Sequence, residues 1–309
     1  MRILVIGAAG QLGHDLLKVL SPDHEVTGAD IAGAGAGLEI DITDPGAVDS
    51  LIIDQKPDLV INSAAFTNVD GCETQKDLCW AVNADGAGNI ARSCSTLESA
   101  TLGELGKAPA NLIHIGTDYV FDGSHSEPYK ENERTAPLGE YGKSKFEGEQ
   151  QVRKALPERH LIVRTAWLFG DNGANFVKTM LKLGRERGEL KVVNDQTGSP
   201  TYAGHLAAAI KLLAENRLSD PGVYHMTNSG HCTWYEFAAE IFRLAAINVD
   251  LKRTTTAEYQ APAPRPAYSV LANTRAPEIV MPHWREGLIE CLEHLGELEN
   301  KDYAGKGRQ

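Results

Sequence analysis

Short apolar runs alternate with helix-forming stretches along the first 170 residues of the chain. The expected strands lie at residues 2–6, 25–29, 58–62 and 111–115. The expected helices between them lie at residues 14–20, 47–55 and 77–99, the second of them capped by Asp44 and Pro45. Regular alternation of strand and helix is typical of a parallel sheet covered by helices. The pattern therefore predicts an α/β fold with a Rossmann-type, doubly wound parallel sheet.

The pattern changes beyond about residue 170. The expected elements there are a helix over 173–187, a strand over 191–193 that returns to the main sheet, an amphipathic helix over 204–215, a strand over 223–225 and a helix over 234–244. We predict a dinucleotide-binding domain over residues 1–170, to which about residues 190–216 return. A smaller α/β substrate-binding domain is predicted over residues 171–309.

The first strand leads directly into a glycine-rich turn that is followed by a helix. Gly7 permits a tight turn, Gly10 lets the backbone approach a pyrophosphate, and Gly13 lets the helix pack closely on the strand. Asp30 ends the second strand, about twenty residues past the turn, where a carboxylate can accept hydrogen bonds from ribose hydroxyls. The same charge repels a 2′-phosphate, and no lysine or arginine lies between Asp30 and Asp41. NADH is therefore the expected cofactor, with NADPH as a second possibility.

Composition and charge narrow the class of protein. The 309 residues are 42% hydrophobic and 23% charged, with a net charge of −12 and a pI near 5.3. An acidic chain is a poor partner for nucleic acid. No apolar run approaches the roughly 20 residues of a membrane span, and the first residues form a strand instead of a signal peptide. The five cysteines form no CxxC pair, so we expect reduced thiols in a cytoplasmic protein.

A tyrosine and a lysine with helical spacing are the candidate catalytic pair. Tyr141 and Lys145 stand four residues apart in a helix-forming stretch over 141–151, so they share one helix face. An ammonium near the phenol is expected to lower its pKa. Thr117 follows the strand over 111–115, where its hydroxyl can hold a carbonyl oxygen. Thr117, Tyr141 and Lys145 thus form a constellation suited to carbonyl reduction.

Further runs extend this pattern over nearly the whole chain. They are GAAGQLG at 7–13, AFTNVDGCE at 65–73, TDYVFDG at 117–123, YGKSK at 141–145, RTAW at 164–167, NFVKTM at 175–180, NDQTGSPT at 194–201 and RPAYS at 265–269. In register, these runs resemble the dTDP-4-dehydrorhamnose reductases, a family of the extended short-chain dehydrogenase/reductase superfamily. The resemblance implies reduction of the C4 ketone of dTDP-4-dehydro-β-L-rhamnose to give dTDP-β-L-rhamnose.

The resemblance also implies roles for individual residues. Tyr141 would donate the proton, Lys145 would lower its pKa and hold the nicotinamide ribose, and Thr117 would orient the keto oxygen. Asp118 and Trp167 would contact the sugar. The expected dinucleotide contacts are Gly10, Gln11 and Leu12 at the pyrophosphate, with Asp41, Ile42, Ala65, Phe66, Thr67 and Ile115 along the cofactor.

Other features of the sequence leave alternatives open. Arg265, in a proline-rich loop, is either a cation for the substrate diphosphate or an ordinary surface arginine. The family commonly has serine where Gly116 stands, a change that the backbone can tolerate. Some relatives bind magnesium at a dimer interface through acidic residues. Asp15 could supply one ligand, but His205 stands near the position of another, so we predict no required metal and a possible homodimer.

Three other functions compete with this interpretation. A sugar-nucleotide dehydratase is expected to have glutamate where Tyr119 stands. Another NDP-4-keto-6-deoxyhexose reductase would share every motif, because specificity lies in the shape of the pocket. A regulatory subunit of the kind that accompanies methionine adenosyltransferase shares the fold, but the intact Thr117, Tyr141 and Lys145 argue against a non-catalytic role.

Overall fold

The structure, a computed structural model, describes residues 1–31, 37–101, 110–275 and 278–299. Within these residues a parallel sheet of seven strands has the order β11-β6-β5-β4-β1-β2-β3. Its strands are β1 (Arg2–Ile6), β2 (Glu25–Asp30), β3 (Leu38–Glu39), β4 (Leu59–Asn62), β5 (Asn111–Thr117), β6 (His160–Thr165) and β11 (Gly222–His225). The sheet confirms the predicted doubly wound α/β fold. The order reverses next to β1, which is where such sheets bind ligands.

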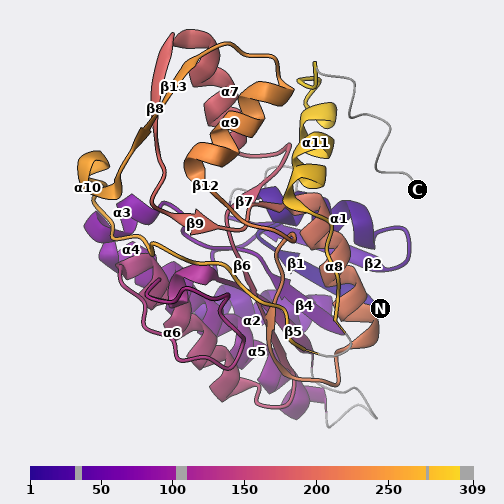
Figure 1. Cartoon of the computed structure of the whole chain (residues 1–309). Helices are drawn as coiled ribbons and strands as arrows, with labels where there is room; N and C mark the ends of the chain where they lie inside the picture. Colours follow the sequence, from indigo (N-terminus) through magenta and orange to yellow (C-terminus); the bar gives the residue numbers. More distant parts are fainter. Residues whose placement is uncertain (32–36, 102–109, 276–277, 300–309) are drawn as a thin grey trace.

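Helices cover both faces of this sheet (Figure 1). On one face, α1 (Gln11–Leu20) packs against α8 (Ala203–Asn216). On the other face lie α2 (Pro45–Gln55), α5 (Ala87–Thr101) and α6 (Glu140–Ala155). In β1, Ile3 and Val5 join the core under α1 and α8, while Leu4 and Ile6 join the core under the other layer. Because β1 is buried on both faces, its sequence is a continuous apolar run instead of an alternating one.

Local signals in the sequence place several helices correctly. Asp44 caps α2 as predicted, accepting hydrogen bonds from the backbone N–H groups of Gly46 and Ala47, with Pro45 in the first turn. The expected helix over 77–99 is more complex. It comprises α4 (Lys76–Trp80), a π-helical stretch η1 (Ala81–Gly86) and α5, preceded by the short helix α3 (Val69–Thr74).

The remaining elements gather beyond the carboxyl ends of the central strands, at the top of Figure 1. They are α7 (Phe176–Glu186), α9 (Trp234–Leu244), α10 (Thr256–Tyr259) and α11 (Trp284–His294), with the strand pairs β8 (Glu189–Val193) and β13 (Asp250–Thr254), β9 (Thr197–Gly198) and β12 (Cys232–Thr233), and β7 (Leu168–Phe169) and β10 (Thr201–Tyr202). A separate core joins α7, α9 and α11 through residues such as Val177, Phe237 and Leu288. The domain boundary at residue 170 stays a prediction.

One expectation about strand pairing is wrong, and another strand joins a sheet for which it was not predicted. The strand over 191–193 does not return to the main sheet, because β8 pairs with β13 instead. The strand over 223–225 belongs to the main sheet, where β11 pairs with β6. In β8 the exposed Glu189 and Lys191 alternate with the buried Leu190 and Val192. Such alternation suits a sheet with one solvated face and does not suit a sheet covered on both sides. The helix predicted over 204–215 does lie on the main sheet, as α8.

Candidate active site

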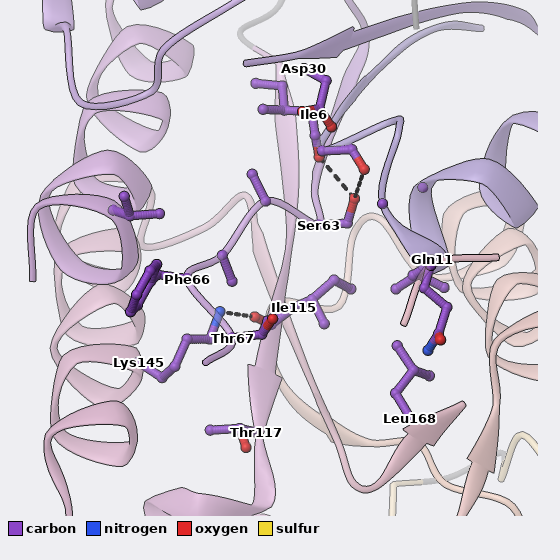
Figure 2. Close-up of a pocket in the computed structure, with 18 of the residues that line it drawn as sticks. Ile6, Gln11, Asp30, Ser63, Phe66, Thr67, Ile115, Thr117, Lys145 and Leu168 are labelled. Atoms are coloured by element: carbon purple, nitrogen blue, oxygen red, sulfur yellow. Dashed lines mark hydrogen bonds between the residues drawn. The ribbon is translucent and has the colours of Figure 1, made fainter. Parts of the chain in front are cut away.

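A cavity of about 910 Å³ opens at the carboxyl ends of β1, β4, β5 and β6. Figure 2 shows Phe66 and Lys145 on one side of it and Gln11 and Leu168 on the other. The predicted site residues that line it are Gly7, Gly10, Gln11, Leu12, Gly13, Asp30, Asp41, Ile42, Ala65, Phe66, Thr67, Ile115, Thr117, Asp118, Tyr141, Lys145 and Trp167. Arg265 is not among the lining residues. The fold therefore gathers both ends of the predicted site around one cavity.

The glycine turn is held by contacts that exclude larger residues. Gly7 has a φ of +86°, and a Cβ there would lie 2.4 Å from the backbone nitrogen of Ala64. A Cβ on Gly13 would lie 2.0 Å from the carbonyl oxygen of Gly7. Gly10 occupies the N-cap of α1, and no side chain caps this helix. The first N–H groups of α1 therefore face the cavity without a capping side chain, an arrangement that suits a pyrophosphate.

Asp30 has a second role at this turn that the sequence does not indicate. Its carboxylate accepts hydrogen bonds from the backbone N–H of Ala9 at 3.0 Å and from that of Ile31 at 2.8 Å. The side chain that is predicted to contact the ribose thus also braces the loop between Gly7 and Gly10.

Asn83 supports the wall of the cavity and was not predicted as a site residue. Its side chain accepts a hydrogen bond from the backbone N–H of Phe66 at 2.8 Å and donates one to the Phe66 carbonyl at 3.1 Å. A third bond, of 3.2 Å, joins it to the hydroxyl of Ser144 on α6. Asn83 lies in the π-helical stretch η1, so the irregular helix fixes the segment that carries Ala65, Phe66 and Thr67. A buried asparagine in a helix was the only signal in the sequence.

Helix α6 delivers Tyr141 and Lys145 to the end of β5, where Thr117 is the last strand residue. Lys145 is buried, and its Nζ donates a hydrogen bond of 2.6 Å to the carbonyl oxygen of Ile115 (Figure 2). Burial lowers the pKa of Lys145 to about 8, while the charge of Glu149 opposes that shift. The structure thus brings the three predicted catalytic residues together.

The expected lowering of the pKa of Tyr141 is wrong for this structure. Burial raises the pKa of the Tyr141 phenol well above its ordinary value, and the hydrogen bond with Thr117 only partly offsets the effect. The ammonium of Lys145 is directed at the Ile115 carbonyl. Tyr119 packs its ring edge-on against Tyr141, with the ring centroids 5.7 Å apart at an angle of 81°. The phenol is consequently protonated at neutral pH.

Asp118 places a carboxyl group at the same end of the cavity. Its Oδ1 accepts a hydrogen bond of 3.1 Å from the Thr117 hydroxyl, while its buried Oδ2 has no hydrogen-bond partner among the described residues. Burial raises the pKa of Asp118 to about 7, and hydrogen bonds from Ser269 and Thr117 oppose this shift. A buried oxygen without a partner is costly, so this position suits a ligand that donates a hydrogen bond.

Trp167 is fixed in an unusual backbone conformation. Its φ is +46°, which is uncommon for a bulky residue and strains the backbone. The ring stacks on that of Trp234, with centroids 3.5 Å apart and planes 7° from parallel. A Cβ on Gly198 would lie 2.4 Å from the Trp167 ring. Trp234 was not predicted as part of the site, because only the tertiary structure places α9 beside the end of β6.

Arg265 is engaged with Asp70 in α3. Its guanidinium makes two hydrogen bonds of 3.0 Å with the two carboxylate oxygens, and a third to the carbonyl of Ala263. The same guanidinium lies beside the Tyr119 phenol and counteracts the rise that burial causes in the pKa of that phenol. The arginine is thus partly buried in an ion pair and does not line the cavity.

The remaining lining residues come from segments flanking the predicted ones. They are Ile6, Ala9, Ile31, Ile40, Ser63, Ala64, Leu78, Val82, Gly116, Thr165, Ala166, Leu168, Gly173 and Ala174. Ser63 and Thr165 stand at strand ends, a position from which the sequence could have identified them. Gly173 and Ala174 lie in a loop with no motif, and only the tertiary structure shows that they line the cavity.

The comparisons with known proteins agree with this site. A family model described as the RmlD substrate binding domain matches residues 1–297. A spore coat polysaccharide biosynthesis protein of Bacillus subtilis is 42% identical over 295 residues, covering 94% of this chain and 97% of the relative. A probable dTDP-4,6-dihydroxy-2-methyloxan-3-one 4-ketoreductase of Streptomyces antibioticus is 39% identical, with 96% of each chain covered. The dTDP-4-dehydrorhamnose reductase of Streptomyces griseus is 38% identical, with 95% and 94% covered.

Solved structures show the same similarity. A dTDP-4-dehydrorhamnose reductase of Clostridium acetobutylicum has a TM-score of 0.86 and 42% identity, with 96% of this chain and 100% of that one covered. The dTDP-4-dehydrorhamnose reductase of Bacillus anthracis, solved in complex with NADP, has a TM-score of 0.86 and 38% identity, with 95% and 99% covered. From its whole-length match and these relatives, the chain belongs to the RmlD substrate binding domain family.

Proposed function

We propose that this protein is an NAD(P)H-dependent reductase that converts dTDP-4-dehydro-β-L-rhamnose to dTDP-β-L-rhamnose, the last step of dTDP-L-rhamnose biosynthesis. The observation that carries the proposal is the convergence of Thr117, Tyr141 and Lys145 on a cavity whose other end is the glycine turn. Two curated dTDP-4-dehydrorhamnose reductases are 40% and 37% identical to the chain over most of its length. This similarity supports the choice of substrate.

The residues present fit a nicotinamide dinucleotide. Gly7 and Gly13 leave no room for a Cβ, which fits the tight turn and the close packing of α1. No side chain caps α1 at Gly10, so its first backbone N–H groups remain open to a pyrophosphate. Asp30, Asp41 and Ile42 would lie along the adenosine part, and Ala65, Phe66, Thr67 and Ile115 along the rest. When bound, the reduced nicotinamide supplies the hydride.

Tyr141 is the proposed proton donor. Burial keeps its phenol protonated at neutral pH, so the proton is present when negative charge develops on the keto oxygen of the substrate. Thr117 would orient that oxygen through its hydroxyl. Its backbone is fixed within β5, and its Oγ1 donates its one proton to Asp118 at 3.1 Å. The hydroxyl would therefore have to turn this proton from Asp118 to the keto oxygen when the substrate binds. Donors placed in advance at such an oxygen stabilise the transition state.

Lys145 is proposed to hold the nicotinamide ribose. An ammonium has three N–H donors, one of which binds the Ile115 carbonyl. With a pKa of about 8, the side chain is mostly charged at neutral pH.

The sugar would lie between Asp118 and Trp167. The free Oδ2 of Asp118 can accept a hydrogen bond from a sugar hydroxyl, and the stacked Trp167 ring offers a flat, rigid surface. Arg265 is proposed to contact the diphosphate, which would require it to share its guanidinium with Asp70.

Asp30 supports a preference for NADH, although the Bacillus anthracis relative was solved with NADP. A homodimer, no required metal and a cytoplasmic location also remain proposals. Within the residues that the structure describes, no helix is long and apolar enough to span a membrane.

A second candidate is the reduction of another NDP-4-keto-6-deoxyhexose. The Streptomyces antibioticus relative, named as a probable 4-ketoreductase of a different dTDP sugar, favours it. A regulatory role has less support, because the catalytic residues are intact and converge. A dehydratase would need glutamate at the position where Tyr119 packs against Tyr141.

The deciding experiment follows the oxidation of NADH and, in parallel, of NADPH with dTDP-4-keto-6-deoxyglucose in the presence and absence of the 3,5-epimerase. The proposed function predicts oxidation only when the epimerase supplies the L-configured ketone. Turnover without the epimerase would favour the second candidate, and no oxidation with either ketone would contradict both.

A further inference from the structure

A buried carboxylate stands behind the catalytic lysine. Glu149 follows Lys145 by one helical turn on α6 and is buried, so the two side chains share a helix face. Lys145 is held by the carbonyl of Ile115, and Thr117 stands two residues further along β5. The carboxylate is thus close to the strand residues that build the catalytic end of the cavity.

Arg164 of β6 holds this carboxylate in a bidentate pair. Its Nε lies 2.9 Å from Oε1 and its Nη2 lies 2.7 Å from Oε2 of Glu149. Both side chains are buried, at 1% and 0% relative exposure. Arg153, which is partly exposed, makes a longer contact: its Nη2 lies 3.8 Å from Oε2 of Glu149. A bidentate pair fixes both the position and the ionised state of a carboxylate.

Gly116 leaves the space that this pair occupies. A Cβ on Gly116 would lie 2.7 Å from Oε1 of Glu149 and 3.0 Å from Cγ of Arg164. Gly116 lies between Ile115, which accepts the bond from Lys145, and Thr117, and it pairs with Arg164 across the sheet. A serine at this position would displace the pair. The absence of a side chain at Gly116 therefore allows Glu149 and Arg164 to take these positions.

We propose that Glu149 is a positioning residue for the reaction, which keeps the buried Lys145 charged and in place, and that Arg164 fixes Glu149 for this purpose. The inference rests on the proposed function, because it assumes that charged Lys145 holds the nicotinamide ribose. Glu149 pairs directly with Arg164 and lies one helical turn from Lys145, whose charge it stabilises without a direct ion pair. A buried cation loses its charge readily when a neighbouring carboxylate is removed.

The other charged and titratable groups around Lys145 do not supply the same support. His114 of β5 faces it, but burial holds the pKa of His114 well below its ordinary value, so the ring is neutral. Cys79 of α4 also raises the pKa of Lys145, but less than Glu149 does, and its Sγ is hydrogen-bonded to the Ser144 hydroxyl. Burial raises the pKa of the Cys72 thiol on α3. Asp118 precedes Tyr119 at the end of β5 and has a pKa of about 7.

Charged groups on the two remaining helical neighbours of α6 are engaged elsewhere. Asp85 of η1 accepts a hydrogen bond from Gln151. Arg92 of α5 bonds Asn89 and Gln151. Glu149 is thus the carboxylate best placed to balance the charge of Lys145.

The test measures the dissociation constant of NADH by fluorescence titration across the pH range, without any sugar. In the wild type, affinity should fall as Lys145 loses its proton, near pH 8. Glu149→Gln keeps the shape and a hydrogen-bond acceptor but removes the charge. It should move this fall to lower pH by about one unit or more. Glu149→Asp restores the charge and should keep the wild-type pH dependence, as should Arg153→Gln, which removes the outer partner.

Three results would overturn the inference. The first is a folded Glu149→Gln protein whose affinity falls at the wild-type pH. The second is a Glu149→Asp protein whose NADH affinity falls at a pH shifted as far as that of Glu149→Gln. If Glu149→Gln yields no folded protein, Glu149→Asp decides alone: a wild-type pH dependence supports the inference and a displaced one overturns it. A wild type that does not bind NADH is titrated with NADPH instead. The third result is a wild type that binds neither cofactor, which would also overturn the proposed function. Binding without turnover of any ketone would count against the proposed function only.

Discussion

Tyr141 lies in an environment that favours the neutral phenol. It is enclosed by the ring of Tyr119 and hydrogen-bonded to Thr117. Since burial raises the pKa of the phenol, the group enters the reaction with its proton. A protonated donor in contact with the developing oxyanion is what ketone reduction needs.

Replacing Tyr141 by phenylalanine keeps the ring and removes the proton. We expect kcat to fall by roughly 10²–10⁴-fold, the usual contribution of general acid catalysis, while the affinity for NADH stays close to that of the wild type. Stopped-flow NADH oxidation and fluorescence titration measure the two quantities. Full turnover by Tyr141→Phe would refute the proposed mechanism.

Lys145→Ala should damage both quantities, in contrast to Tyr141→Phe. The substitution removes the proposed ribose contact and the bond that ties α6 to the Ile115 carbonyl at the end of β5, so NADH binding and kcat should each fall by about tenfold or more. Lys143→Ala is a matched control, because Lys143 lies on the same helix and only contacts Glu140 at its surface. Near-normal NADH affinity in Lys145→Ala would contradict the role assigned to it.

Asp118 should make the stability of the protein depend on pH. Its pKa in the folded state is raised from 3.8 to about 7, so the folded state binds more protons than the unfolded state between these values. Stability therefore falls as the pH rises from about 4 to about 7 and is level above that, with a loss of roughly 4 kcal/mol at most.

Asp118→Asn should remove this dependence while keeping an acceptor for Thr117. Urea unfolding at about pH 5 and about pH 8 should show the variant gaining stability relative to the wild type at the higher pH. Equal differences at both values would mean that Asp118 is ionised throughout in the folded protein.

Asp30 combines a proposed contact with the cofactor and an observed brace for the glycine turn. Asp30→Asn removes the charge but keeps an acceptor for the Ala9 N–H, so the preference for NADH over NADPH should narrow by about tenfold, or 1.4 kcal/mol. Asp30→Ala should narrow it similarly and also weaken both cofactors. Ratios of kcat/KM for NADH and NADPH check this. A large NADPH preference in the wild type would refute the assignment.

The turn between β1 and α1 is the element that depends most on backbone contact. Gly13→Ala would place a Cβ 2.0 Å from the Gly7 carbonyl, which must push α1 away from the strand. We expect a loss of about 1–3 kcal/mol in the free energy of unfolding and an NADH affinity at least about tenfold lower.

Gly188→Ala is the control for this element. Gly188 precedes β8, and no atom lies within 4 Å of a Cβ added there. Calorimetry and NADH titration should therefore show little change for this variant. If Gly13→Ala behaved like Gly188→Ala, the close contact between helix and turn would not matter for the cofactor.

At the scale of the whole molecule, residues 260–271 connect the two parts of the protein. Thr197 of β9 donates to the carbonyl of Ala267 at 2.8 Å, and Tyr129 donates to that of Val270 at 2.9 Å. Ala263 and Arg265 both bind Asp70 of α3. The segment thus ties β9 of the smaller part to α3 and to the loop that contains Tyr129.

Variants of Arg265 and of its partner Asp70 distinguish a structural role of the arginine from binding of the substrate diphosphate. Arg265→Met and Asp70→Asn each break the ion pair, so each should lose up to about 1 kcal/mol of stability, as partly exposed pairs do. Only Arg265→Met removes the proposed contact with substrate, and its KM for the dTDP sugar should rise roughly tenfold above that of Asp70→Asn. Equal KM values in the two variants would leave Arg265 with the structural role alone.

Local patterns in the sequence were enough for the central fold and most of the site. The apolar runs, the glycine spacing and the cap at Asp44 each depend on a few neighbouring residues, because backbone hydrogen bonding and burial impose their own periods. Parallel strands also bring their carboxyl ends to one edge. The motifs at those ends therefore predicted that Gly7, Thr117 and Tyr141 would face one cavity.

Other features were decided only by the tertiary structure. The alternation of exposed and buried residues in β8 suits a sheet with one solvated face, but it does not name β13 as the partner. The place of β11 beside β6 likewise depends on which edge of the main sheet the rest of the chain leaves open. The acceptor of Lys145, the stacking of Trp234 on Trp167 and the pairing of Arg265 with Asp70 join residues far apart in the sequence. Such contacts form when packing of the whole chain brings their elements together, and no local pattern of residues encodes that arrangement.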